Sequence, residues 1–512
     1  MHSWGASRVA SSIFREQGFR AVIEAAEDEI RELYLSDETP WVIGYSGGKD
    51  STAILQLCWN AISGLSEDSR AKPIHVISTD TLVENPIVAL WVNRSLKLMS
   101  DAAEIQRAPI RPHRLTPKLS DSFWVNLIGR GYPAPRLKFR WCTERLKIHP
   151  SNDFIRRVVQ ESGEAVLVLG TRKAESSKRA ATMARHGKKA VRDRLTPNSS
   201  MQNCLVYTPI EDWSNDDVWM YLMQVKNPWG YNNKDLLSMY RGATADGECP
   251  LVVDTNTPSC GNSRFGCWVC TLVDEDKSMA AMIQNDFEKD WMLPLLEIRN
   301  ELDFRSESAR ERDQENRDFR RMTGKVQYFE DKEGRGRLIR GPYTQKARAY
   351  WLRRVLEAQT KVRESGPTEV KGWELITVEE LDEIRRIWLS EKHEAEDILP
   401  QIYEESMGHP YPGQRYERDP LLNDEYLSIL KEIVGDNELH YELTRNLLDI
   451  ECQYRNMARR RGLFGDLQSA IERCFYTSED DALDLATRNA RLRQSDSVDE
   501  LLELEAQNGV EE

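Results

Sequence analysis

The stretch WVIGYSGGKDS, residues 41–51, decides the fold class of this 512-residue chain. Its first six residues form a short apolar run that predicts a buried strand, and residues 51–62 predict a helix directly after it. Glycines let the backbone come close to an anion, and the amides at the start of a helix point toward it. The stretch therefore predicts a phosphate-binding loop, with a Gly-rich turn that binds no ligand as the alternative.

The side chains of this loop suit phosphate chemistry. Lys49 adds a positive charge, and Asp50 is placed to help position a metal ion. The loop is not of the Walker A type, which needs Ser or Thr after the lysine and a glycine five positions before the second one. Here Asp50 follows Lys49, and Ile43 stands five positions before Gly48.

The first half of the chain alternates between strand-like and helix-like patterns. Further apolar runs of strand type lie at residues 74–79, 165–170 and 204–210. A second helix is expected after Pro86, and Ser214 with Asp217 forms the pattern of a capping box at the start of another. Such alternation is typical of an α/β domain with a parallel sheet.

The second half has a different character. From about residue 275 onward, long amphipathic and charge-rich segments dominate, such as 345–360 and 379–392, with a Pro/Gly-rich break at 409–413. We expect an N-terminal helical segment at 1–39, an α/β domain with a cysteine-containing loop at 40–275, and a mainly helical region at 276–512.

Composition excludes several classes of protein. No run of eighteen apolar residues occurs, which predicts no membrane-spanning helix, and the first residues lack a secretory signal, so a cytoplasmic location is expected. Nine cysteines in 512 residues do not form a disulfide framework. The net charge of −14 argues against nonspecific nucleic-acid binding by the whole surface, so DNA contact would need local basic patches.

The loop SGGKDS at residues 46–51 resembles the signature of the PP-loop ATP pyrophosphatases, which split ATP between its α and β phosphates. Three further segments are similar to the branch that contains the phosphoadenylylsulfate reductases. They are Asp80-Thr81, the element Gly170-Thr171-Arg172 with Glu175, Ser176 and Arg179, and the element from Pro209 through Asp212-Trp213 to Trp219. The resemblance implies the adenine nucleotide alpha hydrolase-like fold, with a parallel sheet and a helical C-terminal addition.

The resemblance also implies a site for ATP and Mg²⁺. The residues it assigns to nucleotide binding are Ser46, Gly47, Gly48, Lys49, Asp50, Ser51, Gly170, Arg172 and Arg179. Those it assigns to catalysis are Lys49, Asp50, Asp80, Arg172 and Glu175. Arginines suit this role because a guanidinium can hold phosphate oxygens through two hydrogen bonds. Trp213, Val218 and Trp219 are interpreted instead as packing residues.

Three cysteines, Cys260, Cys267 and Cys270, lie within eleven residues of one another in a loop rich in Gly, Asn and Ser. Such a loop can wrap an iron–sulfur cluster or a zinc ion. Cys142 stands in a segment similar to the one that ligates a [4Fe-4S] cluster in adenylylsulfate reductases. A [4Fe-4S] cluster on Cys142, Cys260, Cys267 and Cys270 is therefore expected, with Cys249 as the reserve ligand and structural zinc as the alternative. Cys58 and Cys204 are expected to be buried apolar residues.

Two local runs reverse the acidic balance of the chain. Residues 172–194 hold nine Lys or Arg against two acids, and residues 334–355 hold seven basic residues and no acid. A solvated face is one interpretation of such a run. Two runs, one of them with aromatic residues, favour contact with a phosphate backbone.

Taken together, the phosphate loop, the cysteines and the helical half resemble the DndC family, the sulfurtransferases of bacterial DNA phosphorothioation. The resemblance implies ATP-driven replacement of a non-bridging phosphate oxygen of DNA by sulfur. It also implies a cysteine desulfurase as sulfur donor and complexes with the partner proteins DndD and DndE. Three alternatives are a tRNA thiolase, a phosphoadenylylsulfate reductase, whose E-C-G-L-H nucleophile motif is absent from this sequence, and a nucleotide-gated DNA-binding scaffold.

Overall fold

The computed structural model describes residues 12–175, 180–181, 183–184, 192, 194–244, 265–330, 336–414 and 422–490. The chain divides into two compact units: Met1–Lys118 with Pro135–Arg299, and Leu119–Ala134 with Asn300–Glu512. Within the described ranges, no helix combines the length and apolarity needed to cross a membrane.

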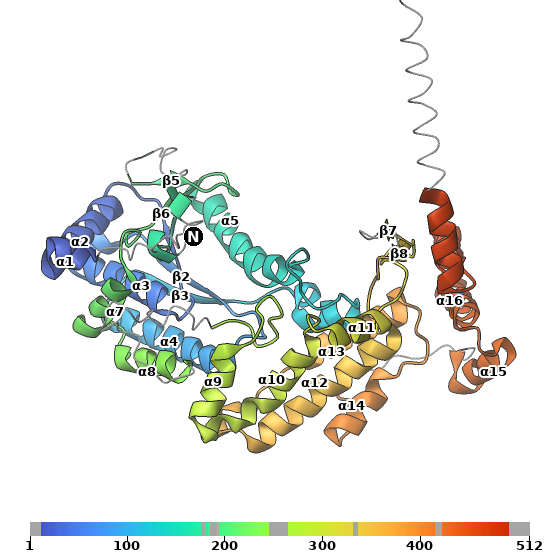
Figure 1. Ribbon diagram of the computed structural model, residues 1–512. Coiled ribbons are helices and arrows are strands. Elements are labelled where there is room, and N and C mark those ends of the chain that lie inside the picture. The colour runs from blue at the N-terminus through green and yellow to red at the C-terminus, as the bar shows by residue number, and fades with distance from the viewer. Residues whose placement is uncertain are drawn as a thin grey trace, which may run out of the picture. The chain divides into compact units, whose positions relative to one another are not determined.

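The first unit contains a six-stranded sheet (Figure 1). Its strands are β1 (Trp41–Gly44), β2 (Ile74–Thr79), β3 (Ile110–Leu115), β4 (Ala165–Val168), β5 (Thr196–Pro197) and β6 (Cys204–Tyr207). The order is β3-β2-β1-β4-β6-β5, and every pairing is parallel except that of β5 with β6. The predicted parallel α/β sheet is confirmed, and β1 lies in its interior between β2 and β4.

Helices cover both faces of this sheet (Figure 1). The helices of the first unit are α1 (Ile13–Gln17), α2 (Phe19–Leu35), α3 (Lys49–Ser63), α4 (Pro86–Ile105), α5 (His149–Ser162), α7 (Asn215–Gln224), α8 (Asn233–Gly242), α9 (Lys277–Asn285) and α10 (Leu293–Leu302), and the last residues of α10 belong to the second unit. Shorter 3-10 or π-type turns are η1 (Glu67–Arg70), η4 (Thr143–Ile148), η5 (Lys173–Glu175) and η6 (Phe287–Met292).

Successive residues of β1 point to opposite faces, as the period of a strand requires. Trp41 and Ile43 belong to the large core that packs with α2, α3 and α7, whereas Val42 belongs to a smaller core that packs with α5. The central strand is buried on both sides. This explains why it appears in the sequence as a continuous apolar run rather than as an alternating one.

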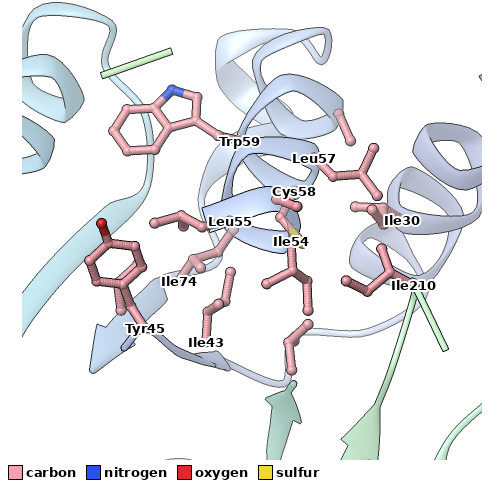
Figure 2. Packing of buried hydrophobic residues seen from close by; sticks show 14 of the residues in the cluster. Ile30, Ile43, Tyr45, Ile54, Leu55, Leu57, Cys58, Trp59, Ile74 and Ile210 are labelled. Carbon is pink, nitrogen blue, oxygen red and sulfur yellow. The ribbon is translucent and has the colours of Figure 1, made fainter. Parts of the chain in front are cut away.

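Helix α3 is the centre of the larger core (Figure 2). Ile54 and Leu55 point toward Ile43 and Ile74 of the sheet, and Cys58 lies among apolar side chains with no exposed surface. Burial raises the pKa of the Cys58 thiol to about 12. The expectation that Cys58 and Cys204 are buried apolar residues is confirmed, since Cys204 is only 2% exposed.

The capping box predicted at the start of α7 is present. Asp217 N donates to Ser214 Oγ at 3.1 Å, and Ser214 N donates to Asp217 Oδ2 at 2.8 Å. Trp213, Val218 and Trp219 are almost completely buried, as their interpretation as packing residues predicted.

The second unit is mainly helical, as expected from the charge-rich second half. Its helices are α11 (Glu307–Glu315), α12 (Gln345–Ser365), α13 (Val378–Arg386), α14 (Leu399–Met407), α15 (Asp424–Val434), α16 (Glu438–Arg455) and α17 (Leu463–Arg473). Shorter turns are η2 (Leu119–Asp121), η3 (Val125–Gly129), η7 (Thr368–Val370) and η8 (Ile387–Glu391). A hairpin of β7 (Tyr328–Glu330) and β8 (Gly336–Leu338) adds two short strands that the sequence did not predict.

One segment between β3 and α5 belongs to the second unit rather than the first. Residues 119–134 carry Trp124, whose Nε1 donates to Leu375 O at 2.7 Å, and Ile128, whose carbonyl accepts from Trp388 Nε1 at 3.0 Å. Trp124 and Ile128 are fully or almost fully buried. The second unit therefore takes part of its core from a segment that lies far from α12 and α13 in the sequence.

Candidate active site

The phosphate loop lies where β1 ends and α3 begins. Gly48 is the N-cap of α3 in an extended conformation, and Thr52 N donates to Gly48 O at 3.0 Å to start the helix. Gly47 has φ +74°, and a Cβ there would lie 2.5 Å from Val92 Cγ2. Both the left-handed backbone and the lack of space require glycine at this position.

Two serines close the loop upon itself. Ser46 N donates to Ser51 Oγ at 3.1 Å, and Ser51 Oγ donates to Gly48 O at 3.0 Å. These bonds hold the loop around the first turn of α3, whose first amides are not used within the helix and form an anion-binding end.

Asp50 links the loop to Arg172, which follows β4, the strand that lies beside β1. Its Oδ2 lies 3.0 Å from Lys49 Nζ, and its Oδ1 lies 2.7 Å from Arg172 Nε. The Arg172 side chain is only 4% exposed and also donates from Nη1 to Trp213 O at 3.2 Å. Glu175 Oε1 accepts from Arg172 N at 2.9 Å. The structure thus brings together Lys49, Asp50, Arg172 and Glu175 as the sequence predicted, and it shows Arg172 fastened to the loop through Asp50.

Asp80 lies at the end of β2, at the same carboxyl edge of the sheet as the loop. Its Oδ2 pairs with Arg114 Nη2 at 2.5 Å, and its Oδ1 accepts from Leu82 N at 2.8 Å. Asp80 therefore binds other residues than Asp50 does. Arg179, the remaining predicted nucleotide ligand, lies outside the described residues.

Gly170 packs directly against the phosphate loop. A Cβ at this position would lie 2.9 Å from Asp50 O and 3.3 Å from Ser51 N, closer than side-chain carbons approach backbone atoms. This contact explains the glycine of the Gly170-Thr171-Arg172 element, because any side chain would push the loop away from β4.

Gly170→Ala is expected to raise the KM for ATP by about tenfold while the protein stays folded. The added methyl costs about 1–3 kcal/mol of overpacking, which the loop can relieve by moving out of its binding geometry. Steady-state pyrophosphate release would measure the change. Gly372→Ala, where a Cβ would meet nothing within 4 Å, is the control. An unchanged KM in Gly170→Ala would show that the loop does not bind the nucleotide phosphates.

The cysteine segment is held against the stretch that follows β2. Cys267 pairs with Glu84 in an antiparallel bridge, and Trp268 N donates to Val83 O at 2.9 Å. The Cys267 Sγ lies 3.3 Å from Thr81 Oγ1 and 3.8 Å from Glu84 Oε1. The cysteine segment therefore lies at the carboxyl edge of the sheet, the edge at which the phosphate loop also lies.

Thiols from two parts of the chain influence one another electrostatically here. Burial raises the pKa of Cys142, and the charge of Cys270 raises it further; Cys270 has the same direction of effect on the pKa of Cys267. Burial is the main cause that raises the pKa of Cys267 to about 12. The charge of Cys270 is thus felt by both Cys142 and Cys267, and the predicted ligand set stays a prediction.

The metal set itself is incomplete in the described part of the chain. There, no three His, Cys, Asp or Glu side chains form a group that could hold a metal ion. The predicted ligand Cys260 and the reserve Cys249 both lie outside the described residues. The three described thiols have the chemistry that iron–sulfur clusters require, and a fourth ligand would have to come from the undescribed segment.

Two residues beside these thiols were missed by the sequence analysis. Lys147 Nζ lies 3.3 Å from Glu84 Oε1, and the pKa of Lys147 is raised chiefly by Cys267, with contributions from Glu84 and Cys270. Both residues stand within a few positions of motifs that the sequence does show, Asp80-Thr81 and Cys142. Only the parallel sheet and the bridge at Cys267 bring them together.

The basic run at residues 334–355 is largely neutralised within the second unit. Five of its seven cations pair with carboxylates: Arg340 with Glu479, Lys346 with Glu438, Arg348 with Glu394, Arg353 with Glu405 and Arg354 with Glu301. Arg335 lies outside the described residues. The pairs give this run a role in holding the helices of its own unit together, and we assign it no contact with DNA.

The run at residues 172–194 shows the same pattern where it is described. Its paired cations are Arg172 with Asp50, Lys173 with Glu211 and Asp212, Arg192 with Asp37 and Glu164, and Arg194 with Glu29 and Glu32. The remaining five basic residues of this run lie outside the described residues.

Comparison with known proteins agrees with the fold and with the loop. Residues 40–272 match the family model described as phosphoadenosine phosphosulfate reductase domain. This part of the chain is therefore similar to PP-loop domains of the phosphoadenosine phosphosulfate reductase type, and the match supports a nucleotide-using domain of sulfur-related chemistry. An uncharacterized protein of Methanocaldococcus jannaschii is 28% identical over 262 residues. That alignment covers 51% of this chain and 42% of the relative, so this chain spans less than half of the relative's length.

Proposed function

We propose that this protein is an ATP-dependent sulfurtransferase that cleaves ATP between its α and β phosphates. The observation that carries the proposal is the arrangement of Lys49 and Asp50 on a glycine loop at the end of β1, with Arg172 paired to Asp50, at the same sheet edge as a cysteine segment. A phosphate loop supplies the electrostatics for a leaving pyrophosphate, and thiols are the usual carriers of sulfur.

The chemistry follows from the charges of the loop. The amides at the start of α3 and Lys49 would hold the β and γ phosphates and stabilise the charge that develops on pyrophosphate. Asp50 keeps Lys49 and Arg172 in place and would help to hold the Mg²⁺ that accompanies ATP. The acceptor oxygen takes the AMP group as pyrophosphate leaves. A sulfur nucleophile then displaces AMP, which departs with that oxygen.

We further propose that the acceptor is a non-bridging phosphate oxygen of DNA, as in the DndC family. This acceptor is supported by the resemblance of the sequence motifs to those of the DndC family. The basic runs at 172–194 and 334–355 do not add support, because most of their described cations pair with carboxylates of the chain itself. The same proposal names a cysteine desulfurase as sulfur donor, DndD and DndE as partners, and the bacterial cytoplasm as the compartment. Cys142, Cys260, Cys267 and Cys270 would hold a [4Fe-4S] cluster, which would relay sulfur or support the fold.

The second candidate is a phosphoadenylylsulfate reductase, which the description of the matching family favours. Against it stands the absence of an E-C-G-L-H nucleophile from the sequence. A reductase would need another thiol for this step.

Product analysis separates these activities. The purified protein, supplied with ATP, Mg²⁺, DNA, cysteine and a cysteine desulfurase, is expected to release AMP and pyrophosphate and to yield nuclease-protected, sulfur-containing DNA. Sulfur in tRNA instead of DNA would identify a tRNA thiolase. Release of sulfite from phosphoadenylylsulfate with a thiol reductant would identify the reductase. A protein that binds ATP and DNA without releasing AMP would be a scaffold.

A further inference from the structure

A tyrosine from α8 occupies the anion-binding end of α3. Lys49 is the first residue of that helix, and its amide donates to Tyr240 Oη at 3.3 Å. Among the described residues, the Tyr240 hydroxyl is the acceptor found for the amides of the first turn of α3. A phosphate oxygen bound in the loop would accept this same hydrogen. The Tyr240 hydroxyl thus stands in the place of a ligand oxygen.

The hydroxyl is a weaker acceptor than a phosphate. Tyr240 is 7% exposed, and burial raises its pKa well above the usual value, so the group is neutral under physiological conditions. Hydrogen bonds to ionised acceptors are roughly twice as strong as those between neutral groups. A phosphate that enters the loop is therefore expected to take the Lys49 amide from the tyrosine.

The tyrosine ring connects the phosphate loop to the cysteine segment. It packs edge-on against Trp219 at 5.2 Å and against Phe265 at 4.8 Å between ring centroids, and Lys49 Nζ lies 5.8 Å from its centroid. Phe265 stands two residues before Cys267. The next residue, Gly266, accepts through its carbonyl from Asn85 N at 3.1 Å. One side chain thus contacts both the nucleotide loop and the start of the segment that carries Cys267 and Cys270.

We propose that Tyr240 is a positioning residue that reports the occupancy of the phosphate loop to the cysteine segment. When phosphate oxygens take the Lys49 amide, the hydroxyl is released, the ring leaves its position against Phe265, and the segment 265–271 loosens. The thiols would then become accessible only after ATP is bound, which suits a reaction in which activation precedes sulfur transfer. The inference rests on the proposed use of ATP at this loop.

The test uses inorganic pyrophosphate as the probe and the full-length protein. Tyr240→Phe keeps an aromatic ring but removes the hydroxyl that competes for the Lys49 amide and holds the ring at the loop. It is therefore expected to bind pyrophosphate about fivefold more tightly in calorimetry, which corresponds to the loss of one ordinary hydrogen bond of about 1 kcal/mol. Tyr34→Phe is the matched control. Tyr34 is also buried, and its hydroxyl bonds to Lys72 O at the opposite edge of the sheet, so its loss should leave pyrophosphate affinity unchanged.

Hydrogen exchange of residues 265–271 provides the second readout. Pyrophosphate is expected to speed exchange of this segment in the wild type and in Tyr34→Phe, but not in Tyr240→Phe. Phe265→Leu keeps the amide-to-hydroxyl bond and removes the ring contact. It should bind pyrophosphate as the wild type does and lose the exchange response.

Each other outcome has a distinct meaning. Equal or weaker binding by Tyr240→Phe, or an exchange response that persists in Tyr240→Phe or in Phe265→Leu, would overturn the role of Tyr240 and leave the ATP site standing. A wild type that binds neither pyrophosphate nor ATP would overturn the proposed function and this inference with it.

Discussion

Lys49→Ala is expected to lower pyrophosphate release from ATP by at least about a hundredfold, because removing one electrostatic donor to developing charge costs about 10²–10³ in rate. The protein should stay folded. Lys49 is an end of the charge chain that runs through Asp50 to Arg172, and its removal leaves the Asp50–Arg172 pair intact. Radiolabelled ATP, with AMP and pyrophosphate separated and counted, measures the rate directly.

Asp50→Asn should have a similar effect on activity and a larger one on stability. Arg172 would lose its carboxylate partner while its side chain stays 4% exposed, and breaking a buried pair in this way costs about 3–5 kcal/mol. Lys173→Ala is the control, since Lys173 is a half-exposed lysine beside Arg172 that pairs with Glu211 and Asp212. Near-normal pyrophosphate release by both loop variants, with unchanged circular dichroism, would contradict the assignment of this loop.

The central part of the fold could be predicted because local pattern and burial coincide there. β1, β2, β4 and β6 are short apolar runs, and each lies within the range that the sequence indicates. β3 (IRPHRL) was missed because its exposed side chains are arginines and its apolar ends give too short a pattern. Pairing with β2 along its whole length, from Ile110 opposite Ile74 to Leu115 opposite Thr79, is what makes it a strand.

The assignment of residues 119–134 to the second unit could not be predicted from the sequence. Residues 119–134 follow β3 directly and are apolar enough to belong to the first core. Their partners, among them Leu375 and Trp388, lie about 250 positions away, with separations of 251 and 260 residues. Contacts at such separations leave no mark on local periodicity.

The candidate site was predicted where its glycines and charged residues lie close together in the sequence, because there the local backbone geometry requires them. The phosphate loop and the Arg172–Glu175 element belong to this group. Tyr240 was missed because it is a single aromatic residue on an amphipathic helix, and only the fold brings its hydroxyl to Lys49. The basic run at 334–355 shows the opposite case. Its charges are conspicuous in the sequence, but their partners, such as Glu301 and Glu479, lie in distant segments.

The other large effect is expected from the cysteines. Protein purified without oxygen should be brown and contain about four irons and four sulfides per chain, held by Cys142, Cys260, Cys267 and Cys270. Cys270 affects the pKa values of Cys142 and Cys267, and the three thiols come from two segments, the N-cap of η4 and the stretch that pairs with Glu84. Each of the four Cys→Ala variants should lose iron and sulfide together, because three thiolates hold a cubane poorly and leave one iron open to oxygen.

Two matched variants separate ligands from structural cysteines. Cys58→Ala removes a thiol of α3 that is completely buried in the core, and the variant should keep its iron although it loses some stability. Cys249→Ala should also keep iron and sulfide, since Cys249 is only the reserve ligand. Colourless protein with one zinc per chain would convert the site into a structural thiolate site. Brown protein that bleaches with Cys249→Ala but not with Cys142→Ala would keep the cluster and remove Cys142 from it. In that case Cys142 would have no role as a ligand, and the cluster would be held by the cysteine segment alone.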